Sequence, residues 1–313
     1  MLQHAPTLDP AKFRHPRTTA KGEPRAQVAL HALDTLWFNT GTLCNLTCRN
    51  CYIESSPRND RLAYLSLADV EKYLDEIACE ELGTRTIGFT GGEPFMNPQF
   101  LDMLELVLAR GFRAMVLTNA MRPMRRLRER LRPLLRFGTA LTIRVSVDHY
   151  TPAVHEQERG ARSWAPTIDG LAWLAAEGFQ VHVAGRRFSN EPEPAIRDGF
   201  RKLFAGLNVP IDADDGERLM LFPEMDVSVD VPEITEACWG ILKKSPGDVM
   251  CASSRMVVRR RDAEPTVVAC TLLPYDLAFD LGSTLWDAAG SVALNHPHCS
   301  KFCILGGAAC SRG

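Results

Sequence analysis

Short apolar segments alternate with amphipathic segments along most of the chain, and this alternation strongly limits the available folds. Strands are predicted at residues 35–40, 86–90, 112–117, 141–147, 179–184 and 218–222. Helices are predicted between them at 66–78, with Ser66 as N-cap, and at 97–110, 125–135, 165–177 and 195–204. Such alternation indicates βαβ units and a parallel sheet. Because six strands are too few for a closed eightfold barrel, we expect an α/β fold with a partial (β/α)6 TIM-like barrel.

The character of the sequence changes after the sixth predicted strand. From about Pro223 proline, glycine and cysteine become frequent, and segments 256–261 and 265–269 predict a β-hairpin. We therefore expect an N-terminal arm (1–33), the barrel (34–230) and a small cysteine-rich appendage that contains the hairpin (231–313). A chain of 313 residues is long enough for this arrangement.

The ten cysteines are unevenly placed. Three lie at 44, 48 and 51, and six lie in the last quarter, namely Cys238, Cys251, Cys270, Cys299, Cys303 and Cys310. The chain shows neither a signal peptide nor a long apolar run, so we expect a cytoplasmic protein without a membrane span. In a reducing compartment clustered cysteines are more often metal ligands than disulfides, which suggests two metal sites. Cys79 lies in a helical pattern and is expected to be a buried core thiol.

The N-terminal cysteine group follows the first predicted strand directly. Cys44, Cys48 and Cys51 are separated by three and by two residues, so their thiolates can bind one face of a [4Fe–4S] cubane. Three ligands leave the fourth iron open, and an open metal position can bind and polarise another molecule. The alternatives are a structural zinc ion or a cluster whose fourth ligand comes from elsewhere in the chain.

This motif, followed by the aromatic Tyr52, resembles that of the radical S-adenosylmethionine (SAM) superfamily. Further matches occur in the family's order, at Thr90-Gly91-Gly92-Glu93-Pro94, Leu117-Thr118-Asn119-Ala120, Val145-Ser146-Val147-Asp148 and His155-Glu-Gln-Glu-Arg159-Gly160. The resemblance covers residues 35–187 well and the C-terminal region more loosely. It implies a [4Fe–4S] cluster on Cys44, Cys48 and Cys51, with SAM chelated at the open iron.

The resemblance also implies which residues contact SAM and what reaction follows. The implied contacts are Tyr52, Gly91, Gly92, Glu93, Asn119, Ser146 and Asp148. The two glycines leave backbone groups bare, Glu93 offers a negative charge to the amino group of SAM, and Asn119 and Ser146 offer neutral hydrogen bonds. Ordinary turn polarity is the alternative for the last two. In the implied reaction, one electron cleaves SAM into methionine and a 5′-deoxyadenosyl radical, which abstracts a hydrogen atom from the substrate.

The C-terminal cysteines resemble those of the "twitch" or shortened SPASM appendage of this superfamily. The resemblance implies a second, auxiliary [4Fe–4S] cluster held by Cys251, Cys270, Cys299 and Cys303, with Cys310 and Cys238 as spare candidates. Four thiolates would close that cluster and leave it a structural or electron-transfer role. A zinc site is the alternative, because His296 and His298 lie beside Cys299.

Seven arginines and a single acid, Glu129, lie between residues 122 and 136. Most simply this segment is the solvated face of an amphipathic helix. The sharper hypothesis is a docking patch for an acidic low-potential electron donor, a flavodoxin or a ferredoxin. A nucleic-acid partner is disfavoured, since no aromatic residues are interleaved with the arginines. The net charge of −2 argues neither for nor against such a partner.

The sequence thus predicts a radical SAM enzyme of oxidoreductase or lyase type. Its substrate would be a small molecule or a peptide, and the outcome oxidation, rearrangement or cross-linking. The segment before the first strand is too short for a leader-binding domain, which favours a small molecule. One alternative is a maturase of a ribosomally made peptide with a separate leader-binding partner. Another is a non-catalytic iron–sulfur or zinc scaffold.

Overall fold

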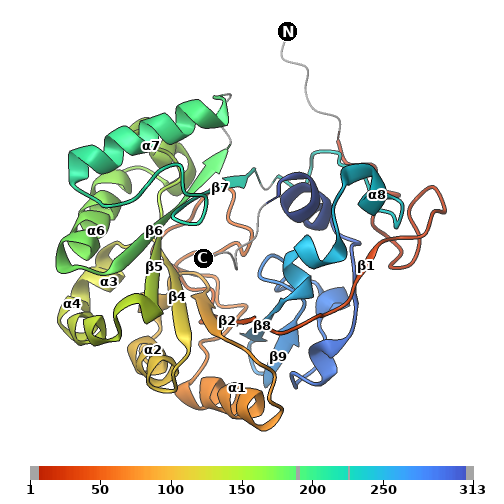
Figure 1. The fold of residues 1–313 in the computed structure, drawn as a ribbon, viewed down its shortest axis with the longest axis horizontal. Coiled ribbons are helices and arrows are strands. Elements are labelled where there is room, and N and C mark those ends of the chain that lie inside the picture. Colours follow the sequence, from red (N-terminus) through yellow and green to blue (C-terminus); the bar gives the residue numbers. More distant parts are fainter. Residues whose placement is uncertain (1–6, 188–190, 225, 308–313) are drawn as a thin grey trace.

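A sheet of eight strands organises the computed structural model, which describes residues 7–187, 191–224 and 226–307 (Figure 1). The strand order is β7-β6-β5-β4-β3-β2-β8-β9. These strands are β2 (Thr35–Asn39), β3 (Thr86–Thr90), β4 (Arg113–Thr118), β5 (Leu141–Ser146), β6 (Gln180–Arg187), β7 (Leu219–Pro223), β8 (Ser254–Arg259) and β9 (Pro265–Val268). Strands β2 to β7 pair in parallel in chain order, which confirms the predicted partial barrel.

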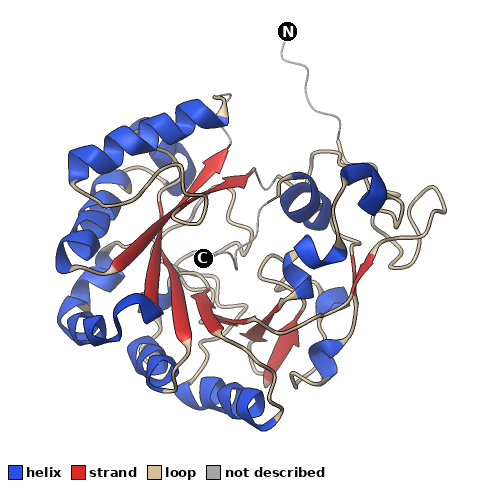
Figure 2. Ribbon diagram, in the orientation of Figure 1, coloured by secondary structure: helices blue, strands red, loops and turns tan. Residues whose placement is uncertain are grey.

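Helices cover the outer side of the curved sheet (Figure 2). They are α1 (Leu67–Cys79), α2 (Phe100–Ala109), α3 (Arg122–Arg126), α4 (Arg128–Leu131), α5 (Pro152–Arg159), α6 (Trp164–Glu177) and α7 (Glu193–Leu207). The short helix α8 (Cys238–Leu242) lies apart from them, in the C-terminal part of the chain (Figure 1). Between helices and sheet lies an apolar core in which the Phe89 ring packs 5.9 Å from Phe38 and 5.4 Å from Phe100. No helix in the described part of the chain has the length and apolar character needed to cross a membrane.

The start of α1 agrees with the sequence prediction. Ser66 Oγ accepts a hydrogen bond from the Asp69 amide at 3.1 Å, and the Asp69 carboxylate accepts one from the Ser66 amide at 2.8 Å. This reciprocal capping box satisfies amide groups that a helix N-terminus otherwise leaves unpaired. At the other end of α1, Cys79 is exposed, so the prediction of a buried core thiol was wrong. The buried face of α1 is formed by residues such as Leu74 and Ile77 instead.

The predicted C-terminal hairpin is present as β8 and β9, and it extends the barrel sheet. Strand β8 pairs in parallel with β2, with Thr35 opposite Ser254, while β9 pairs antiparallel with β8. The segment before β2 also reaches the C-terminal region, since β1 (Gln27–Val28) pairs with β10 (Val292–Ala293). The division of the chain at residue 230 stays a prediction.

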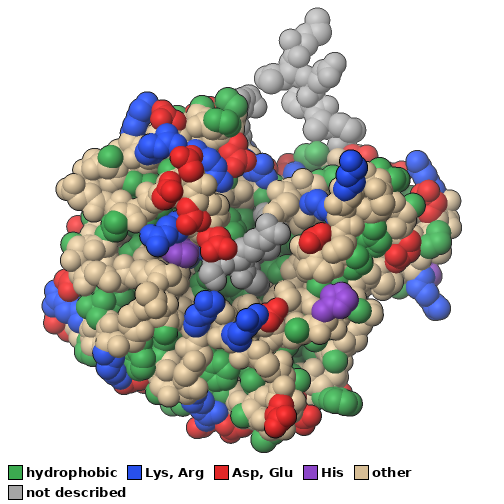
Figure 3. All heavy atoms as spheres, viewed as in Figure 1, with side chains coloured by type: hydrophobic (Ala, Val, Ile, Leu, Met, Phe, Trp, Pro, Cys, Tyr) green, Lys and Arg blue, Asp and Glu red, His purple; other side chains and the backbone are tan. Residues whose placement is uncertain are grey.

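The helix predicted at 125–135 is broken into α3, α4 and a 3-10 segment, Arg132–Ala140. Pro133 lacks an amide hydrogen, which disfavours one continuous helix through this segment. Five of the seven arginines are paired with acids, as Arg125 and Arg128 with Asp169, Arg130 with Asp102, Arg132 with Glu129 and Glu177, and Arg136 with Glu105. Acids of α2 and α6 therefore offset much of the charge. Basic and acidic side chains are likewise interspersed over α7 (Figure 3).

Candidate active site

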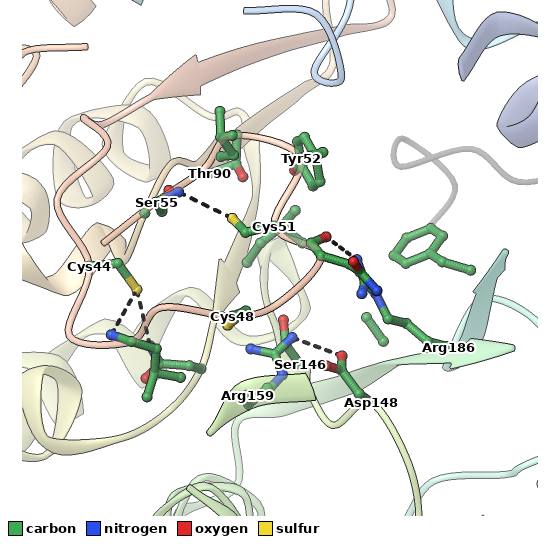
Figure 4. Close-up of a pocket in the computed structure, with 18 of the residues that line it drawn as sticks. Cys44, Cys48, Cys51, Tyr52, Ser55, Thr90, Ser146, Asp148, Arg159 and Arg186 are labelled. Atoms are coloured by element: carbon green, nitrogen blue, oxygen red, sulfur yellow. Dashed lines mark hydrogen bonds and ion pairs between the residues drawn. The ribbon is translucent and has the colours of Figure 1, made fainter. Parts of the chain in front are cut away.

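The main cavity opens at the carboxyl ends of the parallel strands, where α/β barrels place their chemistry. It encloses about 1050 Å³, its open mouth included. Its wall contains all three cysteines of the loop after β2, together with Tyr52, Gly91, Gly92, Asn119, Ser146 and Asp148 (Figure 4). The fold thus brings together every predicted SAM-contacting residue except Glu93.

The cysteine loop presents its sulfur atoms to backbone donors. The Leu46 amide donates to Cys44 Sγ and the Ser55 amide to Cys51 Sγ, each at 3.4 Å. Burial raises the pKa of Cys44 to about 12, and the nearby Glu93 carboxylate adds to this effect. Amide donors at sulfur suit a thiolate ligand, because they stabilise negative charge on the sulfur. Binding to a metal would offset the cost of ionising the buried thiol.

These residues fit an iron–sulfur cluster. The three cysteines form no disulfide, and their loop borders the main cavity. Within the described residues, no three His, Cys, Asp or Glu side chains converge as ligands of a single metal ion would. In a cubane each thiolate binds its own iron, so cluster ligands stand apart. The charges of Arg159 and Arg186 act on Cys48 and would complement an anionic cluster.

The two glycines lie where the end of β3 meets the cysteine loop. Gly91 has φ +142°, a conformation that favours glycine, and a Cβ added at Gly92 would lie 2.2 Å from the Leu43 carbonyl oxygen. The Gly92 amide donates to the Gly41 carbonyl at 2.7 Å. The sequence suggested bare backbone for an approaching ligand. The structure adds that no side chain fits between this turn and the cysteine loop.

Glu93 lies behind the cavity wall. Its carboxylate accepts hydrogen bonds from Thr118 Oγ1 at 2.7 Å and from the Asn119 amide at 2.8 Å. Burial raises the pKa of Glu93 to about 7, although these hydrogen bonds oppose the shift. Glu93 therefore fixes the turn after β4, and its contact with SAM stays a prediction.

Asn119 is oriented by that turn toward the cysteine loop. Its side-chain nitrogen Nδ2 donates to Asn45 Oδ1 at 2.9 Å and lies 3.9 Å from Cys44 Sγ. Ser146, at the end of β5, and Tyr52, which directly follows Cys51, line the same cavity. Neutral polar groups thus lie along the wall beside the cysteines, as recognition of a polar ligand requires.

Asp148 and Arg159 form a buried ion pair on this wall, with Arg159 Nη2 2.9 Å from Asp148 Oδ1. Arg159 belongs to helix α5. His155 of the same helix is fully buried, packs edge-to-face against Trp164 at 5.4 Å and does not line the cavity. Of the two motif residues, only Arg159 faces the site.

Sequence reasoning missed three residues that line this cavity, Asn50, Ser55 and Arg186. Arg186, at the end of β6, donates to the Asn50 carbonyl at 2.9 Å, and the Asn50 side chain donates to Glu158 at 3.1 Å. These contacts tie the cysteine loop to β6 and α5. The Ser55 hydroxyl lines the cavity, is buried and has no hydrogen-bond partner within the described structure. The position of Arg186 at a strand end was the available signal, while Ser55 carries none.

A second, smaller cavity lies in the C-terminal region. Its wall includes the four cysteines predicted to hold an auxiliary cluster, Cys251, Cys270, Cys299 and Cys303. Leu272 lines both this cavity and the main one, so the two share a wall. Cys238 is not part of the lining, and Cys310 lies outside the described residues.

The donor set of the second cavity also fits a cluster. The rest of its lining is mostly apolar, as at Leu273 and Phe279, and burial raises the pKa of Cys251 to about 11. Cys299 and Cys303 lie on a π-helix, Cys299–Leu305, a rare element that is frequent at functional sites. His298 also lines this cavity, so the zinc alternative keeps a candidate ligand.

Comparison with known proteins agrees with this geometry. The family model of the radical SAM superfamily matches residues 38–188. The antilisterial bacteriocin subtilosin biosynthesis protein AlbA of Bacillus subtilis (strain 168) is 33% identical over 174 residues, which are 55% of this chain and 36% of AlbA. Mycofactocin maturase MftC of Mycobacterium ulcerans (strain Agy99) is 28% identical over 152 residues, 48% of this chain and 39% of MftC.

A solved structure with a similar fold is that of Streptococcus suis SuiB bound to S-adenosylmethionine. It superimposes with a TM-score of 0.58 at 12% identity, over 80% of this chain and 63% of SuiB. The segments matched in AlbA and in MftC span well under half the length of each of these two relatives. The family model covers the strands that carry the cysteine loop and the cavity wall, and on these grounds residues 38–188 form a domain of the radical SAM superfamily.

Proposed function

We propose that this protein is an enzyme that cleaves SAM reductively and uses the resulting radical to modify a peptide. The observation that carries the proposal is the main cavity, in which three free cysteines meet polar groups from four strand ends. When bound, the cluster supplies one electron to SAM, which yields methionine and a 5′-deoxyadenosyl radical able to take a hydrogen atom from a C–H bond. The reaction class would be that of an oxidoreductase or lyase.

The chain's own residues position and shield the reactants in this proposal. Cys44, Cys48 and Cys51 hold the cluster, while the Gly91–Gly92 turn lines the cavity beside them and offers its backbone to SAM. Asn119 and Ser146 offer hydrogen bonds, and the Asp148–Arg159 pair sets the charge of the wall.

Another part of the cavity wall is apolar. The rings of Phe222 and Phe302 pack against each other at 5.2 Å, and both line the cavity together with Leu272. Apolar walls exclude water, which would otherwise compete for a reactive intermediate. We place the substrate on this side, with an apolar portion against the two rings.

A peptide substrate is favoured by the names of the two curated relatives, of which one is a bacteriocin biosynthesis protein and the other a maturase. This reverses the modest preference for a small molecule drawn from the sequence. The small molecule stays the second candidate, because the cavity of about 1050 Å³ also suits a ligand of that size beside SAM.

An auxiliary [4Fe–4S] cluster on Cys251, Cys270, Cys299 and Cys303 is part of the proposal. Its support is the lining of the second cavity by all four thiols. We also propose a flavodoxin or ferredoxin as electron donor. The ion pairs of the arginine segment weaken the argument for docking there, and Arg122 and Arg126 are the exposed arginines of that segment without a recorded ion pair in the described structure.

The deciding experiment is anaerobic reconstitution followed by iron counting and an assay of 5′-deoxyadenosine with SAM and dithionite. Two cubanes predict about eight irons per chain. Cys48→Ala should abolish 5′-deoxyadenosine formation, whereas Cys79→Ala, at an exposed cysteine at the end of α1, should not. A reduced, loaded protein that cleaves no SAM with or without candidate peptides would favour the non-catalytic scaffold instead.

A further inference from the structure

Arg255 of β8 is one of the most deeply buried charged side chains in the structure, with 1% of its surface exposed. Its guanidinium donates four hydrogen bonds, all to backbone carbonyls. Nε reaches Ala288 at 2.8 Å, Nη1 reaches Cys251 at 2.6 Å and Ser254 at 2.8 Å, and Nη2 reaches Gly290 at 3.0 Å. The hydrogen-bonding capacity of the group is therefore nearly met.

The charge of Arg255, by contrast, has no recorded partner. No carboxylate among the described residues forms an ion pair with it, although Arg25, also buried, pairs with Glu233. Carbonyl dipoles solvate a cation only partly, and a buried charge without a counter-charge is strongly unfavourable. An arginine kept at this position implies an anion close by.

Among the described residues, the surroundings of Arg255 contain one source of negative charge. Its Nη1 contacts the carbonyl of Cys251, and the thiols of Cys251 and Cys270 are the ionisable groups whose charge acts on it. Both cysteines line the second cavity. Neutral thiols offer no counter-charge, whereas a cluster bound by four thiolates carries net negative charge.

We infer that Arg255 is the built-in counter-charge of an auxiliary iron–sulfur cluster in the second cavity. The inference rests on the proposed function, which places a cluster there. The guanidinium of Arg255 is buried, so water and salt screen its field little. Addition of one electron makes the cluster more negative, and a fixed positive charge stabilises that reduced state. Arg255 therefore raises the reduction potential of the cluster and favours its retention.

The test isolates the auxiliary cluster in the full-length chain by replacing Cys44, Cys48 and Cys51 with alanine. Iron content and an EPR-monitored redox titration are then compared between this parent and its Arg255→Gln and Arg255→Lys derivatives. Glutamine keeps hydrogen-bond donors but loses the charge, while lysine keeps the charge but loses the planar guanidinium group. We expect a more negative potential for Arg255→Gln and a potential near that of the parent for Arg255→Lys.

Arg144→Gln is the matched control. Arg144 is a fully buried arginine of β5 that donates to the Glu217 carbonyl. Its replacement should leave the reduction potential of the auxiliary cluster unchanged. Equal potentials for the parent and Arg255→Gln would overturn the inference.

Iron retention decides the case in which Arg255→Gln does not load. Loss of iron in Arg255→Gln with retention in Arg255→Lys supports a role for the charge. Equal loss in both variants indicates that only the hydrogen bonds of the planar guanidinium matter, and it overturns the inference. A parent without iron would refute the auxiliary cluster itself, a failure of the proposed function that is distinguishable from the others.

Discussion

The guanidinium of Arg159 donates to the carboxylate of Asp148 at 2.9 Å, which joins the last turn of α5 to the chain just beyond β5. Burial alone would raise the pKa of Asp148, but the charges of Arg159 and Arg186 outweigh it and lower that pKa. The pair is therefore ionised at neutral pH and belongs to the wall of the main cavity.

Asp148→Asn should destabilise the protein because it leaves Arg159 buried without its counter-charge. Breaking such a pair costs about 3–5 kcal/mol, so we expect a clear fall in the midpoint of thermal unfolding. SAM binding, measured by equilibrium dialysis on the reconstituted protein, should weaken as well. The matched control is Asp198→Asn, at an exposed acid on α7. Equal unfolding midpoints for both variants would show that the buried pair carries no special weight.

Gly92→Ala should disrupt the cysteine loop, since the new Cβ would lie 2.2 Å from the Leu43 oxygen and backbone would have to move. We expect reduced iron incorporation at the SAM-binding site, measured as iron per chain after reconstitution. Gly206→Ala provides the contrast, because a Cβ there meets no atom within 4 Å on helix α7. Alanine in a helix is favoured over glycine by about 1 kcal/mol, so Gly206→Ala should load normally and unfold at a slightly higher temperature. Normal iron loading in Gly92→Ala would contradict the close packing.

Ser55→Ala should slow SAM cleavage. The Ser55 hydroxyl is buried on the cavity wall without a partner, and the Ser55 amide already donates to Cys51 Sγ. A bound group that accepts the hydroxyl hydrogen would be lost as a partner, at a cost of about 0.5–1.5 kcal/mol, or roughly a two- to tenfold lower rate. Ser55→Thr keeps the hydroxyl and should retain more of the activity. If Ser55→Ala forms 5′-deoxyadenosine as fast as the unmodified protein, the hydroxyl serves no bound group.

Glu233→Gln should lower stability at neutral pH, but not in strong acid. Burial would raise the pKa of Glu233, yet hydrogen bonds from the Ala20 amide and from Arg25 reverse the shift and lower it below the ordinary 4.5. A carboxylate with a lowered pKa contributes stability above pH 4.5 and loses that contribution as the pH falls through its folded-state value.

The free energy of unfolding of Glu233→Gln should thus be lower than that of the unmodified protein by roughly 1.5–3 kcal/mol near pH 7. In acid the two values should converge. Thermal unfolding measured across this pH range checks the difference. Asp230→Asn removes a more exposed ion pair with Lys12 and should have a smaller effect. A difference that stays constant with pH would exclude the ionised carboxylate as its cause.

The sequence was most informative where periodicity or a motif acts locally. The strand at 86–90 and the cap at Ser66 follow from neighbouring residues, and the polar residues expected at the cavity wall follow strands whose ends must meet. Cys79 shows the limit of this reasoning, because one thiol in a helical pattern does not reveal which face of the helix is buried. Its exposure depends on how α1 packs against the sheet.

Residues that act through distant partners escaped prediction for a physical reason. Ser55 has no pattern of its own, and only the folded loop shows that its hydroxyl is enclosed. Arg255 reads as an ordinary charged residue of a strand until Ala288 and Gly290 are seen to surround it. The helix predicted at 125–135 ends before Pro133, and its break at Leu127 has no local signal in the sequence.

The pairing of β2 with β8 has a consequence for how the chain is made. The paired residues lie roughly 220 positions apart, so on the ribosome the first barrel strand emerges long before the strand that covers its outer edge. Until then β2 presents a row of unpaired amide and carbonyl groups, with the cysteine loop directly beyond it. A nascent barrel in this state is open to misassociation with other chains. The last quarter of the protein, which contains β8, therefore protects the edge of β2 only late in synthesis.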